Sequence, residues 1–320
     1  MPARSASPLS DENSLARRDG PRKRTVQPAL ASRVAERPDL DGGWLVAADA
    51  HQGLVTRVRE LWRYRRILWF FSLKSLQTLY SKTVLGPAWI FIRTLVPLGV
   101  SSFVFGSIMQ VPSGGVPYFV FFLAGQVPWN CFDGPLIRGS RGIEINRQLL
   151  TKLYVPRIIL PLASMTAGVA EPVIIALVLA GSLVYYRVNE GVWYLRPEPQ
   201  LLAAIAAVVL VLAFAFSLTL WTSVWQARAR DARFMLRYVV GFWLFLTPVI
   251  YPLSAVPADI RWLAQLNPLT APIETFKWAL LPGMQHSWGW FLYSVGATVS
   301  VFLAGAWYFT RSESITMDKL

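Results

Sequence analysis

The sequence is poor in the residues that build metal and catalytic sites. It contains one cysteine, Cys131, and two histidines, His51 and His286, among 320 residues. One cysteine excludes a disulfide within a chain and any multi-cysteine metal site. Two histidines so far apart in the sequence make a histidine-based zinc site within one chain unexpected. We therefore predict no metal site and no catalytic residue.

A phosphate-binding loop is also absent. The motif G-x-x-x-x-G-K-[ST], which cradles nucleotide phosphates, occurs nowhere in the chain. We expect the chain to hydrolyse no ATP by itself and to hold no cofactor. If ATP drives its activity, ATP and magnesium bind to a separate polypeptide.

Acidic residues are few, with 18 Asp and Glu against 31 Lys and Arg. Before Arg57 the two signs nearly balance, so the positive surplus lies in the apolar remainder, beside the ends of predicted membrane helices. This placement is typical of membrane topology. We expect a membrane partner and no nucleic acid.

Hydrophobic residues make up 54% of the chain, and the mean hydropathy is +0.41, too apolar for an ordinary soluble domain. Apolar runs predict an all-α membrane protein with six spans, at about 89–109, 118–132, 158–186, 201–225, 238–250 and 288–309. The fifth run is short for a straight span of roughly 20 residues. Because several prolines follow it, we expect re-entrant half-helices on the external side before the last span.

The distribution of basic residues predicts both termini on the cytoplasmic side. Sixteen Lys and Arg lie in predicted cytoplasmic segments before the tail, among them Arg138, Arg141 and Arg157. Predicted external segments hold four: Arg187, Arg196, Arg261 and Lys277.

Four regions follow from these patterns. Residues 1–52 are rich in Ser, Pro, Arg and Asp and are predicted to be a disordered cytoplasmic arm, with no apolar run typical of a cleaved signal peptide. Residues 53–84 are predicted to be an amphipathic helix in the membrane interface. Residues 85–311 form the membrane domain, and 312–320 a cytoplasmic tail.

The amphipathic helix carries one stripe of large side chains, Trp62, Trp69, Leu73, Leu76 and Tyr80, at helical spacing. Basic residues, among them Arg63, Arg65 and Arg66, accompany this stripe. Such a helix places its rings at headgroup depth and its basic groups near phosphates. A plain membrane anchor and a substrate-guiding helix both fit this pattern.

Two further features suggest roles. A short, partly polar helix from Glu144 to Lys152 lies between the second and third spans, and either transmits force from a partner or only fixes orientation. Glu171 lies inside the third span, where a carboxylate must face protein or water. It is either a channel acid or a structural acid satisfied by a neighbouring helix.

Three blocks, LYSKTVLGPAWIFIRTLVPL, FLAGQVPWN and INRQLLTKLYVPRIILPLA, resemble the permease subunits of ABC-type exporters of polysaccharides and polyol phosphates. That family serves O-antigen, capsule and wall teichoic acid export, and the resemblance runs from about Leu61 to the C-terminus. It implies a non-enzymatic transport subunit in the bacterial inner membrane. It also implies a homodimer with a translocation path between the copies, two ABC ATPase subunits and a lipid-linked polysaccharide substrate.

The resemblance also implies roles for individual residues. It implies that the helix around residues 62–80 is a gate for the lipid-linked phosphate. The gate residues are Trp62, Arg63, Arg65, Arg66, Trp69 and Tyr80. The predicted ATPase-coupling residues are Glu144, Asn146, Arg147, Gln148, Lys152, Arg228, Arg230 and Asp231. Many family members have Gln-Pro where this chain reads Arg93-Thr94, so no family role passes to Arg93.

Two other functions stay open on the sequence alone. An ABC exporter of a small drug or lipid has a similar six-span layout, although the LGPAW and TKLYVPR blocks favour polymer export. An integral-membrane enzyme acting on polyprenyl phosphate would need clustered acids or histidines near the interface. The acids here are scattered, and the interface clusters are basic.

Overall fold

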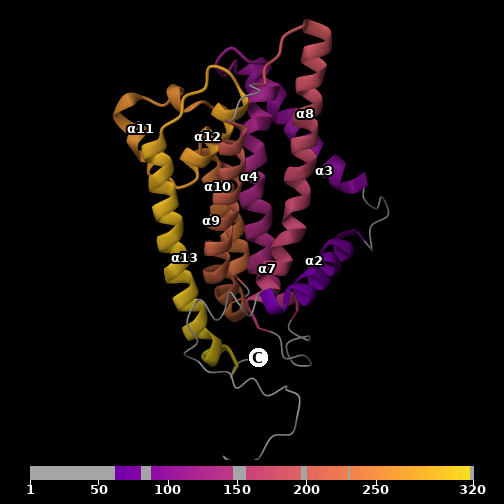
Figure 1. Ribbon diagram of the computed structural model, residues 1–320, viewed down its shortest axis with the longest axis vertical. Helices are drawn as coiled ribbons and strands as arrows, with labels where there is room; N and C mark the ends of the chain where they lie inside the picture. Colours follow the sequence, from indigo (N-terminus) through magenta and orange to yellow (C-terminus); the bar gives the residue numbers. More distant parts are fainter. Residues whose placement is uncertain (1–61, 81–87, 147–155, 196–199, 230, 318–320) are drawn as a thin grey trace, which may run out of the picture. The chain divides into compact units, whose positions relative to one another are not determined.

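The computed structural model describes residues 62–80, 88–146, 156–195, 200–229 and 231–317 (Figure 1). The predicted N-terminal arm lies outside the described residues. Within the described ranges all regular structure is helical and no strand occurs, which confirms the all-α prediction.

The helices follow one another along the chain as antiparallel rods and short connecting turns. They are α2 (Arg65–Tyr80), α3 (Ala88–Ser102) with the π-helical η2 (Phe103–Ile108), α4 (Tyr118–Ser140), α5 (Gly142–Ile145), α7 (Ile159–Thr166), η3 (Ala167–Val169), α8 (Ala170–Glu190), α9 (Leu201–Arg228), α10 (Ala232–Leu246), η4 (Leu253–Ala255), α11 (Ala258–Gln265), α12 (Thr270–Leu280) and α13 (Trp288–Met317).

Four helical segments are long and apolar enough to cross a membrane: Ala88–Ile108, Ile159–Glu190, Leu201–Arg228 and Trp288–Ser312. They coincide with the predicted first, third, fourth and sixth spans, so the chain is a multi-pass membrane protein. The other two predicted spans correspond to α4 and α10. α4 is polar in places, and α10, at 15 residues, is shorter than the roughly 20 that a straight span needs.

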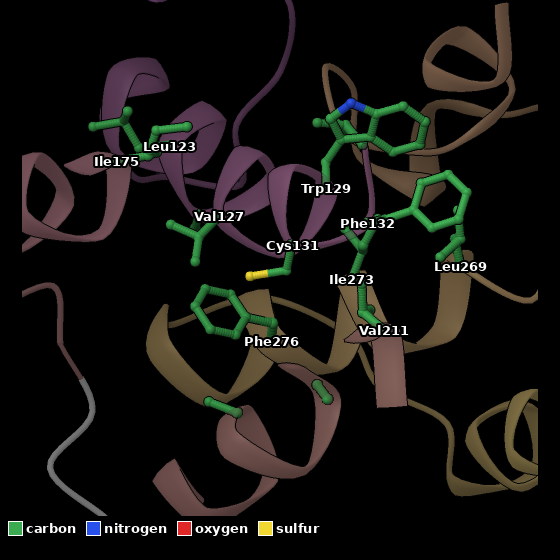
Figure 2. Close-up of a cluster of buried hydrophobic side chains, with 14 of the residues drawn as sticks. Leu123, Val127, Trp129, Cys131, Phe132, Ile175, Val211, Leu269, Ile273 and Phe276 are labelled. Atoms are coloured by element: carbon green, nitrogen blue, oxygen red, sulfur yellow. The ribbon is translucent and has the colours of Figure 1, made fainter. Parts of the chain in front are cut away.

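α4 is the central helix of the fold and contacts α7, α8, α9, α10 and α12. Its side chains Phe121, Phe122, Phe132 and Leu136 are buried, and the Phe132 ring centroid lies 5.4 Å from that of Trp243. Figure 2 shows Leu123, Val127 and Cys131 of α4 meeting side chains of three other helices, Ile175 of α8, Val211 of α9, and Ile273 and Phe276 of α12. The core is therefore built around one helix contacted on several sides.

The helix of the predicted second span does not end near Phe132. α4 continues to Ser140, through both Pro128 and Pro135. Neighbouring helices on several sides hold it in place, and prolines are tolerated in such helices when the surroundings satisfy the freed backbone groups. Arg138 consequently lies in the last turn of α4, not in a following loop helix.

α2 packs beside α7 (Figure 1), and α7 also contacts α5. Its inner face comprises Ile67, Leu68 and Phe71, which, with the preceding Tyr64, pack with Ile159, Leu160 and Ala163. The predicted aromatic stripe lies outside this contact, since Trp62 and Trp69 are exposed. α2 thus has one face against the bundle and a second, ring-bearing face open to the surroundings.

The opposite end of the bundle carries α11 and α12, two short helices between α10 and α13 (Figure 1). They lie where we expected re-entrant half-helices, and their re-entry into a membrane stays a prediction. α12 is mostly buried and contacts α4, α9 and α13, whereas α11 exposes Ile260, Trp262 and Leu263.

Candidate functional site

α5 connects several helices although it contains only four residues. A Cβ on Gly142 would lie 2.7 Å from the Leu160 carbonyl oxygen, so only glycine allows this contact with α7. The next residue, Ile143, is buried against Leu220 and Val224 of α9 and Phe309 of α13. α5 is therefore fixed to three helices through two consecutive residues.

The third residue of α5, Glu144, forms ion pairs with two arginines. Its Oε1 accepts a hydrogen bond from Arg233 Nη1 on α10 at 3.4 Å. Its Oε2 lies 3.8 Å from Arg141 Nε, at the end of α4, too long for a hydrogen bond. One carboxylate thus links the loop after α4 to the first turn of α10.

The remaining predicted coupling residues fall partly within the structure. Asn146 is half-buried and donates a hydrogen bond from Nδ2 to the Gly142 carbonyl oxygen at 2.9 Å. Arg228 ends α9 and Asp231 precedes α10, and both are exposed. Arg147, Gln148, Lys152 and Arg230 lie outside the described residues, as does most of the predicted helix from Glu144 to Lys152.

At the same end, Ile145 exposes 60% of its surface directly after the buried Ile143. α5 therefore buries its first two residues, leaves Glu144 partly exposed and presents Ile145 outward. A single exposed apolar residue is common on protein surfaces and does not by itself mark a contact with a partner.

Glu171 has protein partners that the sequence did not reveal. Its carboxylate pairs with Arg93 of α3, and its Oε1 accepts a hydrogen bond from Arg138 Nη2 of α4 at 3.2 Å. Sequence reasoning gave Arg93 only an interfacial placement, so it missed this three-helix contact. The available signal was a carboxylate inside the third span, which needs a partner, together with an arginine inside the first span.

The predicted gate residues on α2 are described except for the Tyr80 side chain. Arg63, Arg65 and Arg66 are exposed. The Arg65 guanidinium lies 5.5 Å from the Trp62 ring centroid and donates a hydrogen bond to the Trp62 carbonyl oxygen at 3.3 Å. The exposed face of α2 therefore combines cations with rings, as a phosphate-bearing interface requires.

Lys277 is not the external loop charge that the sequence suggested. It is fully buried in α12, where Nζ donates to the Pro248 carbonyl oxygen at 2.5 Å and to Glu274 Oε1 at 3.3 Å. The same Nζ lies 4.2 Å from the Phe121 ring centroid. A buried ammonium needs such partners, so Lys277 ties α12 to the turn after α10 and to α4.

A cavity of about 260 Å³ opens beside α12. Polar side chains at its lining include Gln265, Thr270, Glu274 and His286, and Trp290 adds an indole ring. Thr275 Oγ1 donates to the Ala271 carbonyl oxygen at 2.7 Å, so it must accept from His286 Nδ1, 3.0 Å away. Burial lowers the pKa of His286, and the imidazole is therefore neutral at pH 7.

Comparison with known proteins agrees with this arrangement. Residues 67–281 match the family model described as ABC-2 type transporter. The chain is also similar to the O-antigen export system permease protein RfbA of Myxococcus xanthus, with 26% identity over 227 residues, covering 70% of this chain and 84% of that protein. These matches confirm the resemblance to permeases of polysaccharide exporters. With four apolar helices able to span a membrane and a family match that extends from α2 to the end of α12, the chain belongs to the ABC-2 type transporter family.

Proposed function

We propose that the chain is the permease subunit of an ATP-driven exporter that moves a lipid-linked polysaccharide across the bacterial inner membrane. The observation that carries this proposal is the similarity to an O-antigen export permease over most of both chains. The glycan belongs to the cell-envelope class that includes O-antigen, capsule and teichoic acid.

The proposed topology has six spans, with α4 and α10 added to the four apolar helices. Both termini then lie in the cytoplasm, and α5 lies on the cytoplasmic side with Arg138, Arg141, Arg228 and Arg233. This concentration of arginine at one end of the bundle supports the orientation. α11, α12 and the cavity then face the external side.

A homodimer supplies the proposed path. α10 exposes four rings on one helical stripe, Phe234, Tyr238, Phe242 and Phe245, and buries only Val240. Stacked rings suit the flat C–H faces of sugars better than fixed charges do. We propose that α3 and α10 of two copies enclose the polysaccharide.

Two ATPase subunits are proposed to bind at the α5 end, and they hold the ATP and magnesium that this chain does not. Ile145, Asn146, Arg228 and Asp231 lie on that surface. The exposed arginines of α2 are proposed to attract the phosphate groups of the lipid carrier as the substrate enters.

Deletion of the gene tests the proposed function. Surface polysaccharide should disappear while its lipid-linked precursor accumulates in the inner leaflet, and the wild-type gene should restore export. An unchanged surface glycan together with altered drug or lipid efflux would favour the small-molecule exporter. Turnover of polyprenyl phosphate by the purified chain alone would favour the membrane enzyme.

A further inference from the structure

The cavity beside α12 has room for one small ligand. Its volume of about 260 Å³ lies just below the roughly 300–1,000 Å³ of pockets for drug-sized ligands, so it fits a single ring and not a chain. The lining comes from the turn before α4, the segment around η4, the end of α11, α12 and the start of α13. Distant segments thus converge on one small space with polar side chains, which is typical of a ligand site.

The walls of the cavity are held in place by close contacts. Gly114 and Gly283 both have positive φ angles, +69° and +76°, and a Cβ on Gly283 would lie 2.9 Å from the Gly114 carbonyl oxygen. Only glycine therefore allows these two loops to meet. His286, whose imidazole is fixed by Thr275, also stacks on Trp278 with ring centroids 4.6 Å apart. A site whose walls are already fixed loses less entropy when a ligand binds.

Glu274 brings a carboxylate with unused hydrogen-bonding capacity to this cavity. Its side chain is only 12% exposed, and Oε1 accepts a hydrogen bond from Lys277 Nζ at 3.3 Å. The carboxylate has no other hydrogen-bond partner among the described residues, although it offers about four acceptor positions. Buried polar groups are normally satisfied, so it favours a ligand that donates hydrogen bonds.

The charges around the cavity favour a neutral ligand. Glu274 is the only charged residue at the lining within the described part of the chain, and Lys277 already offsets its charge. An anionic ligand would meet no Lys or Arg there, and an uncompensated charge is costly in a confined site. A cation would meet a carboxylate that is already paired. Hydroxyl groups are therefore the donors that suit Glu274 best.

Other groups at the lining match a hydroxylated ring. The Gln265 side chain and the Trp290 indole N–H make no hydrogen bond within the described residues. Thr270 Oγ1 donates to the Ala264 carbonyl oxygen at 2.6 Å, so it can accept from a ligand. Trp290 also supplies a flat apolar surface, on which the C–H face of a sugar can stack. Donors, acceptors and a ring around one small space fit a single sugar better than an apolar molecule.

The cavity follows directly on the aromatic stripe of α10. Phe245 is the last ring of that stripe, and its carbonyl oxygen accepts a hydrogen bond from the Tyr251 hydroxyl at 3.0 Å. The next three residues, 252–254, line the cavity. A glycan that moves along the stripe would therefore meet the cavity at the end of α10.

We propose that this cavity is a saccharide-binding subsite that takes one neutral sugar ring. Glu274 accepts hydrogen bonds from two neighbouring hydroxyls, Gln265 bonds a third, and Trp290 contacts the C–H face of the ring. Held there, one sugar of the emerging glycan is kept from sliding back. This use during export rests on the proposed function, whereas binding of the sugar is a property of the chain alone.

Binding of methyl glycosides to the full-length chain tests the subsite, in lipid nanodiscs that contain neither ATPase nor glycoside detergent. Saturation-transfer NMR titrations use the methyl glycosides of glucose, galactose, mannose, rhamnose and N-acetylglucosamine. At least one should bind with a Kd on the order of 1 mM, as expected for a ligand of about a dozen heavy atoms. Choline, a small cation, should not displace it. Binding of none of the glycosides, or displacement by choline, would overturn the neutral sugar site.

Variants at the lining locate the bound glycoside. Gln265→Ala and Trp290→Ala should each weaken its binding by about two- to tenfold, because each removes one hydrogen bond or one stacking surface. Trp193→Ala and Glu190→Gln, two exposed residues outside the cavity, should leave the Kd unchanged. Wild-type affinity in both Gln265→Ala and Trp290→Ala would place the sugar elsewhere and refute the subsite.

Glu274→Gln should weaken binding more, by about tenfold or more, since hydrogen bonds to a charged group are the stronger ones. It also leaves Lys277 with the Pro248 carbonyl oxygen alone, which threatens the fold. If this variant does not fold, Gln265→Ala and Trp290→Ala decide the outcome, because neither belongs to the buried pair.

Export in cells separates this inference from the proposed function. Gln265→Ala/Trp290→Ala should lower surface polysaccharide per expressed permease severalfold, and wild-type export by this double variant would refute the role of the cavity in export. If the wild-type chain exports no glycan but the glycosides bind as expected, the proposed function fails and the subsite stands. If export proceeds but no glycoside binds, the subsite fails and the proposed function stands.

Discussion

Glu171, in the first turn of α8, forms ion pairs with Arg93 of α3 and Arg138 of α4, so one carboxylate joins three helices. α3 is the least buried of the four candidate spans. This charged contact therefore adds to the few buried residues of α3, Ile90, Thr94 and Leu98, in attaching it to the bundle. All three side chains are partly exposed, so solvent weakens the contact relative to a fully buried one.

Replacing Glu171 with Gln should detach α3 in part. We expect a loss of roughly 1 kcal/mol in the free energy of unfolding, since the pairs are neither fully exposed nor fully buried. Thermal unfolding in detergent measures the change, and Glu190→Gln, at the exposed far end of α8, serves as the control. Arg93→Gln should add little to Glu171→Gln, because both variants remove the same contact. Fully additive losses would contradict the shared contact.

Two glycines in the same span should respond in opposite ways to alanine. A Cβ on Gly168 would lie 2.3 Å from Pro135 N of α4, whereas nothing lies within 4 Å of one on Gly181. Gly168→Ala should destabilise the fold by about 1–3 kcal/mol, because the backbones of η3 and α4 must separate. Gly181→Ala should leave stability unchanged or raise it by about 0.5–1 kcal/mol, because alanine favours helix. Equal unfolding temperatures for the two variants would show that η3 and α4 do not approach so closely.

The contacts of these glycines mark what the sequence could not predict. Apolar runs and basic loops predicted the helical class, the four apolar spans and the short helices before the last one, because a bilayer imposes length and charge rules on single segments. Gly134 against Gly168, and Lys277 against Pro248, depend on which segments meet in space. The residue pattern within one helix does not predict which residues of other helices it contacts.

In the candidate site, too, local features could be predicted from the sequence, whereas contacts between distant residues could not. The family resemblance implied that Glu144 faces the ATPase. The structure shows it paired with Arg233, 89 residues further along the chain. The cations and rings of α2 predicted from helical periodicity are exposed in the structure, and their place in a membrane interface stays a prediction. The separate contact of α2 with α7 was not predicted.

The arginines of α2 should act on substrate entry through their charge. Each basic group near an anionic surface contributes on the order of 1 kcal/mol, so Arg63→Gln/Arg65→Gln/Arg66→Gln should reduce export strongly. The matched triple replacement by lysine should keep most of the export, since it retains the charges. Surface polysaccharide per expressed permease is the readout, with dimer assembly checked by crosslinking. If the glutamine variant exports at the wild-type level, α2 acts only as a membrane anchor.

The aromatic stripe of α10 should lie at the contact between two copies of the chain. Phe242 exposes 70% of its surface, and the chain's single cysteine, Cys131, is buried. Phe242→Cys should therefore give a dimer with a thiol crosslinker long enough to span a sugar chain, with little background from Cys131. Leu292→Cys on α13 is equally exposed but belongs to a face that we assign to lipid, and it should give none. Tyr238→Ala/Phe242→Ala should lower export severalfold while preserving expression, because two sugar-stacking surfaces are lost from each copy. Dimers through Leu292→Cys, with none through Phe242→Cys, would place the path on another face of the permease and leave α10 against lipid.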